Sequence, residues 1–294
     1  MTDNMKRTAL IVGCGYTGIR LGQRLAETGV KVVGTSRRAK GTDLQAAGIE
    51  VLAGELHDPA VLASIGALKP SLVAYFVPPQ RQDDPLPLVI EASRHAGLEA
   101  FLYAGSTGVY GDRGGEWVDE TTPIIDKDPT GDPLRHAAER VVLEAGRQGA
   151  PTRICRISGI YGPGRTLRSL LETGAYTLIE GHDPWVGRIH VDDLVSGFLA
   201  AWTRGSNGAA YNMVDQRPHL ASEFSNLSAD LNKLPRPPII SLEVARARHA
   251  EAELRRKLAS KRLRCERLQS ELGVEFKYPT YLTGLPAAVA ADAG

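Results

Sequence analysis

The chain has few cysteines, few aromatic residues, almost no net charge and no long apolar run. Its three cysteines, Cys14, Cys155 and Cys265, lie far apart and form no Cys-x-x-Cys pair. The sequence therefore predicts neither a disulfide framework nor a zinc site, and it contains no pattern typical of another metal centre. The 35 Lys and Arg residues nearly balance the 34 Asp and Glu residues. This balance gives no global electrostatic reason to expect binding to nucleic acid or to an anionic membrane.

The sequence also lacks the signals that direct a chain into or across a membrane. No apolar run approaches the roughly 20 residues that span a bilayer. The polar segment 1–7 does not resemble a signal peptide. We therefore expect a cytoplasmic protein with reduced thiols.

A Gly-x-Gly-x-x-Gly motif stands near the start, between an apolar run at 9–12 and a helical pattern at 19–27. The order strand, glycine turn, helix is typical of a dinucleotide-binding loop. In that loop Gly13 permits the tight turn, Gly15 lets a pyrophosphate approach the backbone, and Gly18 lets the helix pack against the strand. The helix N-terminus offers free N–H donors to the phosphates. The residues expected to contact the dinucleotide here are Gly13, Gly15, Tyr16, Thr17 and Gly18.

Apolar, β-branched runs alternate with helical patterns through the first two-thirds of the chain, which predicts a parallel sheet. Strands are predicted at 8–12, 31–35, 50–53, 71–76, 100–104, 153–157 and 210–214, and helices at 18–28, 42–47, 59–65, 86–96 and 133–148. The predicted fold class is α/β, a doubly wound parallel-sheet Rossmann fold with a smaller C-terminal substrate-binding portion. The Rossmann domain is expected in 1–157, with 189–215 added to its core. The smaller portion is expected in 158–188 and 216–294.

The pattern loosens between 158 and 188, where we expect mostly loops. After the proline-rich break at 235–238, a helical stretch rich in Lys and Arg is predicted over 243–272. Leu254, Leu258 and Leu268 are expected to form its buried stripe. We interpret its charges as a solvated face and not as an RNA-binding surface.

The residues after the second strand bear on the choice of dinucleotide. A carboxylate at this position accepts hydrogen bonds from the ribose 2′-hydroxyl of NAD. Here the strand ends in Ser36, Arg37 and Arg38, and guanidinium groups suit a 2′-phosphate. The sequence therefore favours NADP(H) over NAD(H). The alternative is that these arginines are exposed loop charges without a ligand.

Five further segments complete an ordered set of motifs. They are Ala-Gly-Ser-Thr-Gly-Val-Tyr-Gly at 104–111, Arg-Ile-Ser-Gly-Ile-Tyr-Gly-Pro-Gly-Arg at 156–165, Arg-Ile-His-Val-Asp-Asp-Leu at 188–194, Tyr-Asn-Met-Val at 211–214, and Tyr-Pro-Thr-Tyr at 278–281. With the glycine loop, this set resembles the NAD-dependent epimerase/dehydratase family, the extended short-chain dehydrogenases/reductases. The spacing of the three glycines and the C-terminal segments resemble an atypical branch of that superfamily.

The resemblance implies roles for particular residues. Ser106 matches the serine that bonds the substrate hydroxyl or carbonyl beside the dinucleotide. Glu55 and Leu56 match an acidic-apolar pair next to the adenine, and Val77 and Pro78 should line the dinucleotide. The residues expected on the substrate side are Thr107, Tyr161, Arg165 and Arg188.

The chain departs from the family at its central Tyr-x-x-x-Lys pair. Aligning Glu139 with the family's glutamate puts Gly131 at the tyrosine position and Arg135 at the lysine position. Glycine has no side chain that could exchange a proton, whereas Arg135 could still bind the ribose. Asp132 and Pro133 are typical of a helix N-cap and first helical position.

Two nearby side chains are candidates for the missing proton donor. Tyr110 belongs to a turn that is mainly structural in the family, and we favour that role. His136 has a suitable pKa, although it lies about 100° round the helix from Arg135. We interpret His190 as structural, with Asp192 and Asp193 organising the start of the next helix.

Three functions remain open at this point. The first is an NADP(H)-dependent oxidoreductase or epimerase acting on a nucleotide sugar or another small carbonyl compound through a nonstandard acid. The second is a dinucleotide-binding sensor without hydride chemistry, and the third is a non-redox isomerase or lyase with a phosphate ligand. The partner in each case is a small molecule, and the chain is expected to be a monomer or a homodimer.

Overall fold

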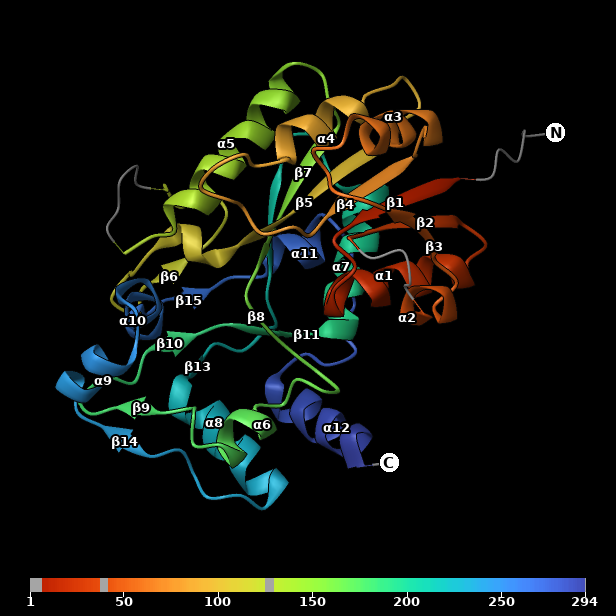
Figure 1. The fold of residues 1–294 in the computed structure, drawn as a ribbon. Helices are drawn as coiled ribbons and strands as arrows, with labels where there is room; N and C mark the ends of the chain where they lie inside the picture. Colours follow the sequence, from red (N-terminus) through yellow and green to blue (C-terminus); the bar gives the residue numbers. More distant parts are fainter. Residues whose placement is uncertain (1–6, 38–41, 125–129, 294) are drawn as a thin grey trace.

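The centre of the molecule is a seven-stranded parallel sheet (Figure 1). The structure, a computed structural model, describes residues 7–37, 42–124 and 130–293. Its strands run in the order β12-β7-β5-β4-β1-β2-β3. Their bounds are β1 Thr8–Val12, β2 Lys31–Ser36, β3 Glu50–Ala53, β4 Leu72–Tyr75, β5 Ala100–Ser106, β7 Thr152–Ile157 and β12 Ala210–Met213. All seven predicted strands are confirmed, and the fold is the doubly wound α/β fold.

Successive side chains of each strand point to opposite faces of the sheet. Leu10 and Val12 pack with Val142 on one face, whereas Ala9 and Ile11 pack on the other. Each face is covered by helices, which explains why β1 and β4 carry buried side chains on both of their faces. The first face carries α3 (Pro59–Leu68), α4 (Leu86–Ala92) and α5 (Pro133–Arg147), and the second carries α1 (Tyr16–Glu27) and α7 (Val191–Arg204). The short helix α2 spans Thr42–Ala46.

The strand order reverses between β1 and β4. From β1 the chain winds outward through β2 and β3, and it then returns to β4 on the other side of β1. Ligands of doubly wound sheets bind outside the carboxyl ends of the strands at such a switch point. The glycine loop follows β1 at this place.

The rest of the chain forms a second region beyond the carboxyl edge of the sheet (Figure 1). It contains α6 (Arg168–Glu172), α8 (Ala221–Asn232) and α12 (Tyr281–Ala293). Its short strands form separate two-stranded sheets: β8 (Gly159–Tyr161) pairs with β11 (Arg188–His190), β9 (Leu178–Ile179) with β14 (Ile239–Ile240), and β10 (Trp185–Val186) with β13 (His219–Leu220). Tyr161, Phe224, Tyr281 and Leu285 form its apolar centre. The interval 158–188 is thus more ordered than the sequence predicted.

The single charged helix expected over 243–272 is wrong. The structure has α9 (Leu242–Arg248), α10 (Glu251–Leu258) and α11 (Glu266–Ser270), separated by extended residues. His249 ends α9 and Ala259 ends α10 in extended conformations. The chain then forms β15 (Arg262–Leu263), which pairs with β6 (Trp117–Val118). Strand pairing at 262–263 therefore overrides the helical propensity of this segment.

The expected stripe of leucines is divided accordingly. Leu254 and Leu258 pack with Ile179 and Ala245, away from the main sheet. Leu268 instead belongs to the core beneath the sheet. The three side chains therefore stabilise two different parts of the molecule.

The described ranges hold neither a candidate membrane span nor a candidate metal site. None of the helices there combines the length and apolarity needed to cross a bilayer. No cluster of three or more His, Cys, Asp or Glu side chains in those ranges is placed to hold a metal ion.

Candidate functional site

The three glycines after β1 differ in what surrounds them. Gly13 has a φ of +94°, and a Cβ there would lie 3.2 Å from the backbone of Phe76 and Val77. A Cβ on Gly18 would lie 2.6 Å from the carbonyl oxygen of Gly13. A Cβ on Gly15 would meet no protein atom within 4 Å. The packing of the protein requires the first two glycines, whereas Gly15 leaves open space that fits a pyrophosphate against the backbone.

Helix α1 begins at this open space. Its N-cap is Gly15, which supplies no side-chain cap, and its first turn contains no acidic residue. The first N–H groups of a helix have no partner within the helix. The loop therefore presents N–H donors and the positive end of the helix dipole to an anionic ligand.

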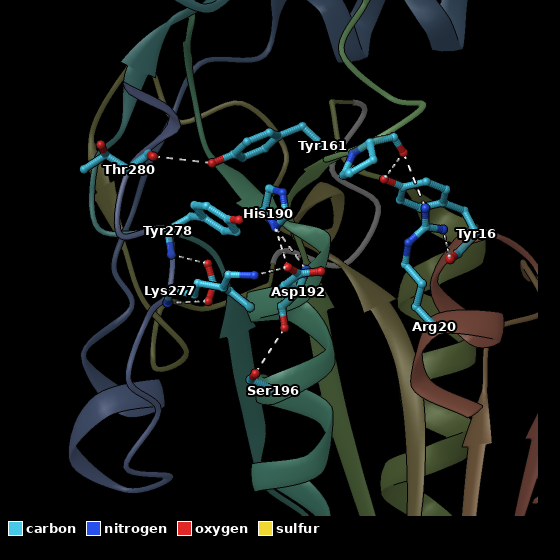
Figure 2. A network of polar contacts seen from close by, with 11 residues as sticks. Tyr16, Arg20, Tyr161, His190, Asp192, Ser196, Lys277, Tyr278 and Thr280 are labelled. Atoms are coloured by element: carbon cyan, nitrogen blue, oxygen red, sulfur yellow. Dashed lines mark hydrogen bonds and ion pairs between the residues drawn. The ribbon is translucent and has the colours of Figure 1, made fainter. Parts of the chain in front are cut away.

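Tyr16, the first residue of α1, connects the glycine loop to the segment 162–165 (Figure 2). Its hydroxyl donates to the carbonyl oxygen of Pro163 over 2.8 Å. The Arg20 guanidinium lies 3.8 Å from the centre of the Tyr16 ring, and that of Arg165 lies 5.5 Å from it. Burial raises the pKa of Tyr16. The glycine motif predicts that Tyr16 lies near the dinucleotide, but it does not predict this contact between two distant segments.

The ends of β2 and β3 hold the residues expected near the ribose and adenine. Ser36 ends β2, and the exposed Arg37 follows it. Arg38 lies outside the described residues. Glu55 is exposed and Leu56 is half-buried just after β3. This edge of the sheet thus places Arg37 and Glu55 in solvent, available to a ligand.

Ser106 is the last residue of β5. In the sheet β5 lies beside β4, and β4 lies beside β1, the strand that precedes the glycine loop. Its Oγ accepts a hydrogen bond from the Gly108 N–H over 3.1 Å and so caps the 3₁₀ turn η1 (Thr107–Tyr110). Val77 and Pro78 follow the neighbouring strand β4. The hydroxyl of Thr107 is directed to the carbonyl oxygen of Ile157 over 3.5 Å, and the side chain is buried. Ser106 is therefore the more available of the two hydroxyls.

The start of α5 confirms the cap predicted from the sequence. Asp132 is the N-cap and accepts a hydrogen bond from the Arg135 N–H over 3.2 Å, and Pro133 is the first helical residue. Gly131 lies just outside the helix. The Arg135 Nε is 3.5 Å from the Asp132 carboxylate, and His136 follows on the same turn, half-buried. Gly131, which the sequence predicts at the family's tyrosine position, thus offers no side chain, and Arg135, predicted at the lysine position, is paired with Asp132.

Tyr110 is buried among polar partners. Its hydroxyl donates to Asn212 Oδ1 over 2.8 Å and accepts from Arg156 Nη1 over 2.9 Å. Burial raises the pKa of Tyr110 to about 12. Since both hydrogen-bonding capacities are used and the ring is inaccessible, the geometry favours a structural role over the proton transfer considered from the sequence.

A cavity of about 610 Å³ opens beside β8 and α6. Two of the four expected substrate-side residues, Arg165 and Arg188, line it. Apolar lining comes from Ile160, Leu167 and Leu170. Tyr161 is instead fully buried, and its hydroxyl donates to the Thr280 carbonyl oxygen over 3.4 Å. Substrate contact by Tyr161, which the resemblance implied, does not agree with this placement.

The Arg-Ile-His-Val-Asp-Asp segment forms the network of Figure 2. His190 is the N-cap of α7, and its Nδ1 accepts from the Asp192 N–H over 3.1 Å. The Asp193 carboxylate accepts from the backbone N–H groups of Lys277 and Tyr278 over 2.7 and 2.9 Å. Burial lowers the pKa of His190 to about 4. These contacts support a structural role, with the histidine itself as the cap and an aspartate holding the C-terminal segment.

Comparison with known proteins agrees with this geometry. The NAD dependent epimerase/dehydratase family matches residues 9–214. A curated ketoreductase of Stigmatella aurantiaca, which acts on 4-hydroxy-2-methyl-3-oxo-4-farnesyl-3,4-dihydroquinoline-1-oxide, is 25% identical over 254 residues, 78% of this chain and 76% of its own length.

Two solved structures share the architecture. A conserved protein of unknown function from Silicibacter pomeroyi is 32% identical, with a TM-score of 0.80 over 97% of this chain and 98% of its own. A UDP-glucose 4-epimerase from Thermotoga maritima is 17% identical with a TM-score of 0.79, covering 97% of this chain and 98% of its own, and shows the shared fold.

The fold and the glycine loop define a Rossmann protein of the short-chain dehydrogenase/reductase class that binds a nicotinamide dinucleotide. Within that class, the chain belongs to the NAD-dependent epimerase/dehydratase family.

Proposed function

We propose that the protein is an oxidoreductase or epimerase-like enzyme that uses NADP(H) on a small carbonyl or hydroxyl compound, with a nucleotide sugar as one class of substrate. The supporting observation is that the open space at Gly15, the hydroxyl of Ser106 and the cavity lined by Arg165 and Arg188 all lie beyond the carboxyl edge of one sheet. A bound dinucleotide supplies or accepts the hydride. A ketoreductase among the relatives supports carbonyl chemistry.

The chain's own residues would hold the dinucleotide along this edge. The glycine loop would bind the pyrophosphate, Arg135 the ribose, and the ends of β2 and β3 the adenosine half. The proposed contacts are Gly13, Gly15, Tyr16, Thr17, Gly18, Ser36, Arg37, Arg38, Glu55, Leu56, Val77, Pro78, Ser106 and Arg135. The segments 158–188 and 216–294 would form the substrate-binding portion.

The preference for NADP(H) rests on the end of β2. No carboxylate stands at 36–37, where the ribose 2′-hydroxyl of NAD would need an acceptor, and Arg37 is exposed. Isothermal titration with both dinucleotides tests this preference. We expect NADPH to bind at least tenfold more tightly than NADH, and equal affinities would contradict the proposal.

The proton donor is proposed to be nonstandard. Gly131 has no side chain, and Arg135 is a poor acid or base at neutral pH. His136 or a water molecule would move the proton, and Ser106 would orient the substrate carbonyl. A Ser106→Ala variant should lose most of its turnover while keeping its NADPH affinity, and unchanged turnover would remove Ser106 from the mechanism.

The alternative is an NADP(H)-binding sensor without hydride transfer. The missing tyrosine and the pairing of Arg135 with Asp132 favour it. NADPH fluorescence titration, followed by NADPH consumption with a panel of carbonyl compounds, separates the two functions. Binding with consumption supports the enzyme, binding without consumption across the panel supports the sensor, and absence of binding contradicts both.

A further inference from the structure

The turn formed by residues 162–165 lies between the glycine loop and the cavity beside β8 and α6. Its own hydrogen bond runs from the Arg165 N–H to the Gly162 carbonyl oxygen over 2.8 Å. Gly164 and Arg165 are exposed, and both line the cavity. The position of this turn therefore determines part of the cavity wall.

Helix α1 holds this turn from one side (Figure 2). The Pro163 carbonyl oxygen accepts from the Tyr16 hydroxyl over 2.8 Å and from Arg20 Nη2 over 3.4 Å. A Cβ on Gly162 would lie 2.7 Å from the Tyr16 hydroxyl oxygen, so only a glycine allows the turn to approach so closely. The Arg20 guanidinium stacks on the Tyr16 ring, and its Nη1 donates to the Tyr16 carbonyl oxygen over 2.9 Å. Tyr16 therefore links the first turn of α1 to the turn 162–165.

Helix α12 holds the same turn from another side. The Gly164 N–H donates to Asp292 Oδ1, and the hydroxyl of the next buried residue, Thr166, donates to Asp292 Oδ2 over 3.2 Å. Neither bond involves the glycine loop. Two elements therefore hold the turn, and one of them, α1, begins at the expected dinucleotide site.

The start of α1 differs from the starts of other helices around the sheet. Helices α3, α5 and α7 begin with side-chain caps from Asp58, Asp132 and His190. The N-cap of α1, Gly15, provides no such bond, and the first turn contains no acidic residue. A cap stabilises the first turn of a helix, and an anion bound to the free N–H groups supplies the missing acceptor. The stability of the turn that carries Tyr16 therefore depends on whether a ligand occupies the loop.

We propose that Tyr16 is a positioning residue that couples the dinucleotide loop to the cavity wall. A dinucleotide at the glycine loop stabilises the first turn of α1, and the bond from Tyr16 to Pro163 passes this stabilisation to the turn 162–165. Coupling of this kind is reciprocal, so a cavity ligand that favours the same position of the turn raises the dinucleotide affinity by the same factor. The inference rests on the dinucleotide binding of the proposed function and does not require hydride transfer.

The test measures amide hydrogen exchange of Gly164 and Arg165 in the full chain, with and without dinucleotide. Fluorescence titration with NADPH and with NADH comes first, and each variant is then saturated according to its own affinity. In the unsubstituted protein we expect the tighter-binding dinucleotide to slow exchange of these amides by about fivefold or more. In Tyr16→Phe, which lacks the hydroxyl that donates to Pro163, the dinucleotide should slow exchange by less than about twofold.

Asp292→Ala is the matched control, because it releases the same turn from α12. Both variants should exchange faster than the unsubstituted protein when no dinucleotide is present. Asp292→Ala should nevertheless keep the full slowing by the dinucleotide, since its link between α1 and Pro163 is intact. If Tyr16 only supported the turn, the two variants would respond to the dinucleotide in the same way. Unchanged exchange of the β5 amides shows that each variant is folded.

Three results overturn the coupling while leaving dinucleotide binding intact. The first is a dinucleotide that binds to the unsubstituted protein without slowing exchange in the turn. The second is full slowing in Tyr16→Phe, which would mean that the dinucleotide contacts the turn directly. The third is an equal loss of slowing in Asp292→Ala and Tyr16→Phe. If neither NADPH nor NADH binds, the titration itself contradicts the proposed function and the coupling together.

Discussion

The glycine loop shows how one residue type serves two purposes. Gly13 and Gly18 avoid clashes with neighbouring backbone atoms, so the protein's own packing accounts for them. Gly15 faces open space and has an extended backbone that any residue could adopt. A ligand that approaches the loop from solvent, such as a pyrophosphate, would explain why this position is a glycine.

Two alanine variants separate these purposes. Gly15→Ala should change the free energy of unfolding by less than about 1 kcal/mol, the usual range for an N-cap change, yet weaken NADPH binding at least tenfold. Gly18→Ala should lower the free energy of unfolding by about 1–3 kcal/mol, because its Cβ would meet the Gly13 carbonyl oxygen. Urea denaturation and NADPH titration measure the two effects. Tight NADPH binding by Gly15→Ala would contradict the role assigned to this glycine.

At the scale of elements, a buried ion pair joins α5 to the sheet. The Arg156 Nη2 of β7 lies 2.9 Å from the Glu139 carboxylate of α5, and both side chains are buried. The same arginine donates to the hydroxyl of Tyr110. These bonds hold α5, whose first turn carries Arg135, against β7, the neighbour of the strand β5 that ends at Ser106.

Removing one partner of this pair should be costly. Glu139→Gln should lower the free energy of unfolding by about 3 kcal/mol, because it leaves the Arg156 charge buried without its counter-ion. Glu144→Gln on the same helix removes an exposed pair with Arg147 and serves as the matched control, with no change expected. Urea denaturation measures the free energy of unfolding of both variants. Equal losses would contradict the claim that the buried pair stabilises the protein more than the exposed pair.

The strands and the helix caps could be predicted from the sequence, whereas contacts between distant segments could not. A run such as that of β1 is apolar on both faces, and Asp132 with Pro133 marks a helix start by local chemistry alone. The segment 243–272 has helical composition, but its strand pairing with β6 is decided by tertiary structure. The stacking of Arg188 on Phe224 likewise joins residues whose proximity only the fold determines.

At the scale of the whole molecule, two buried histidines link stability to pH. Burial lowers the pKa of His190 and of His219 to about 4. Their pKa in the unfolded chain is about 6.5. Lowering the pH therefore protonates the unfolded chain first, and stability is lost between about pH 6.5 and pH 4.

Because each histidine is protonated more readily in the unfolded chain, it should lower the free energy of unfolding by about 2 kcal/mol between pH 7 and pH 5. His190→Asn keeps a good N-cap for α7 and removes one of the two titrations. Urea denaturation at both pH values should show a smaller loss for this variant than for the unsubstituted protein. The titration of carboxyl groups contributes equally to both proteins, so it cancels in this comparison. An identical pH dependence of the two proteins would contradict the lowered pKa of His190.

The wall of the cavity is completed by Asp292, which holds the backbone of Gly164 and the side chain of Thr166. The last strand of the main sheet ends at Met213. A ribosome adding roughly 5–20 residues per second therefore finishes the sheet several seconds before residue 292 is made. All seven strands of the main sheet are thus synthesised before the cavity can acquire its final shape, which requires Asp292.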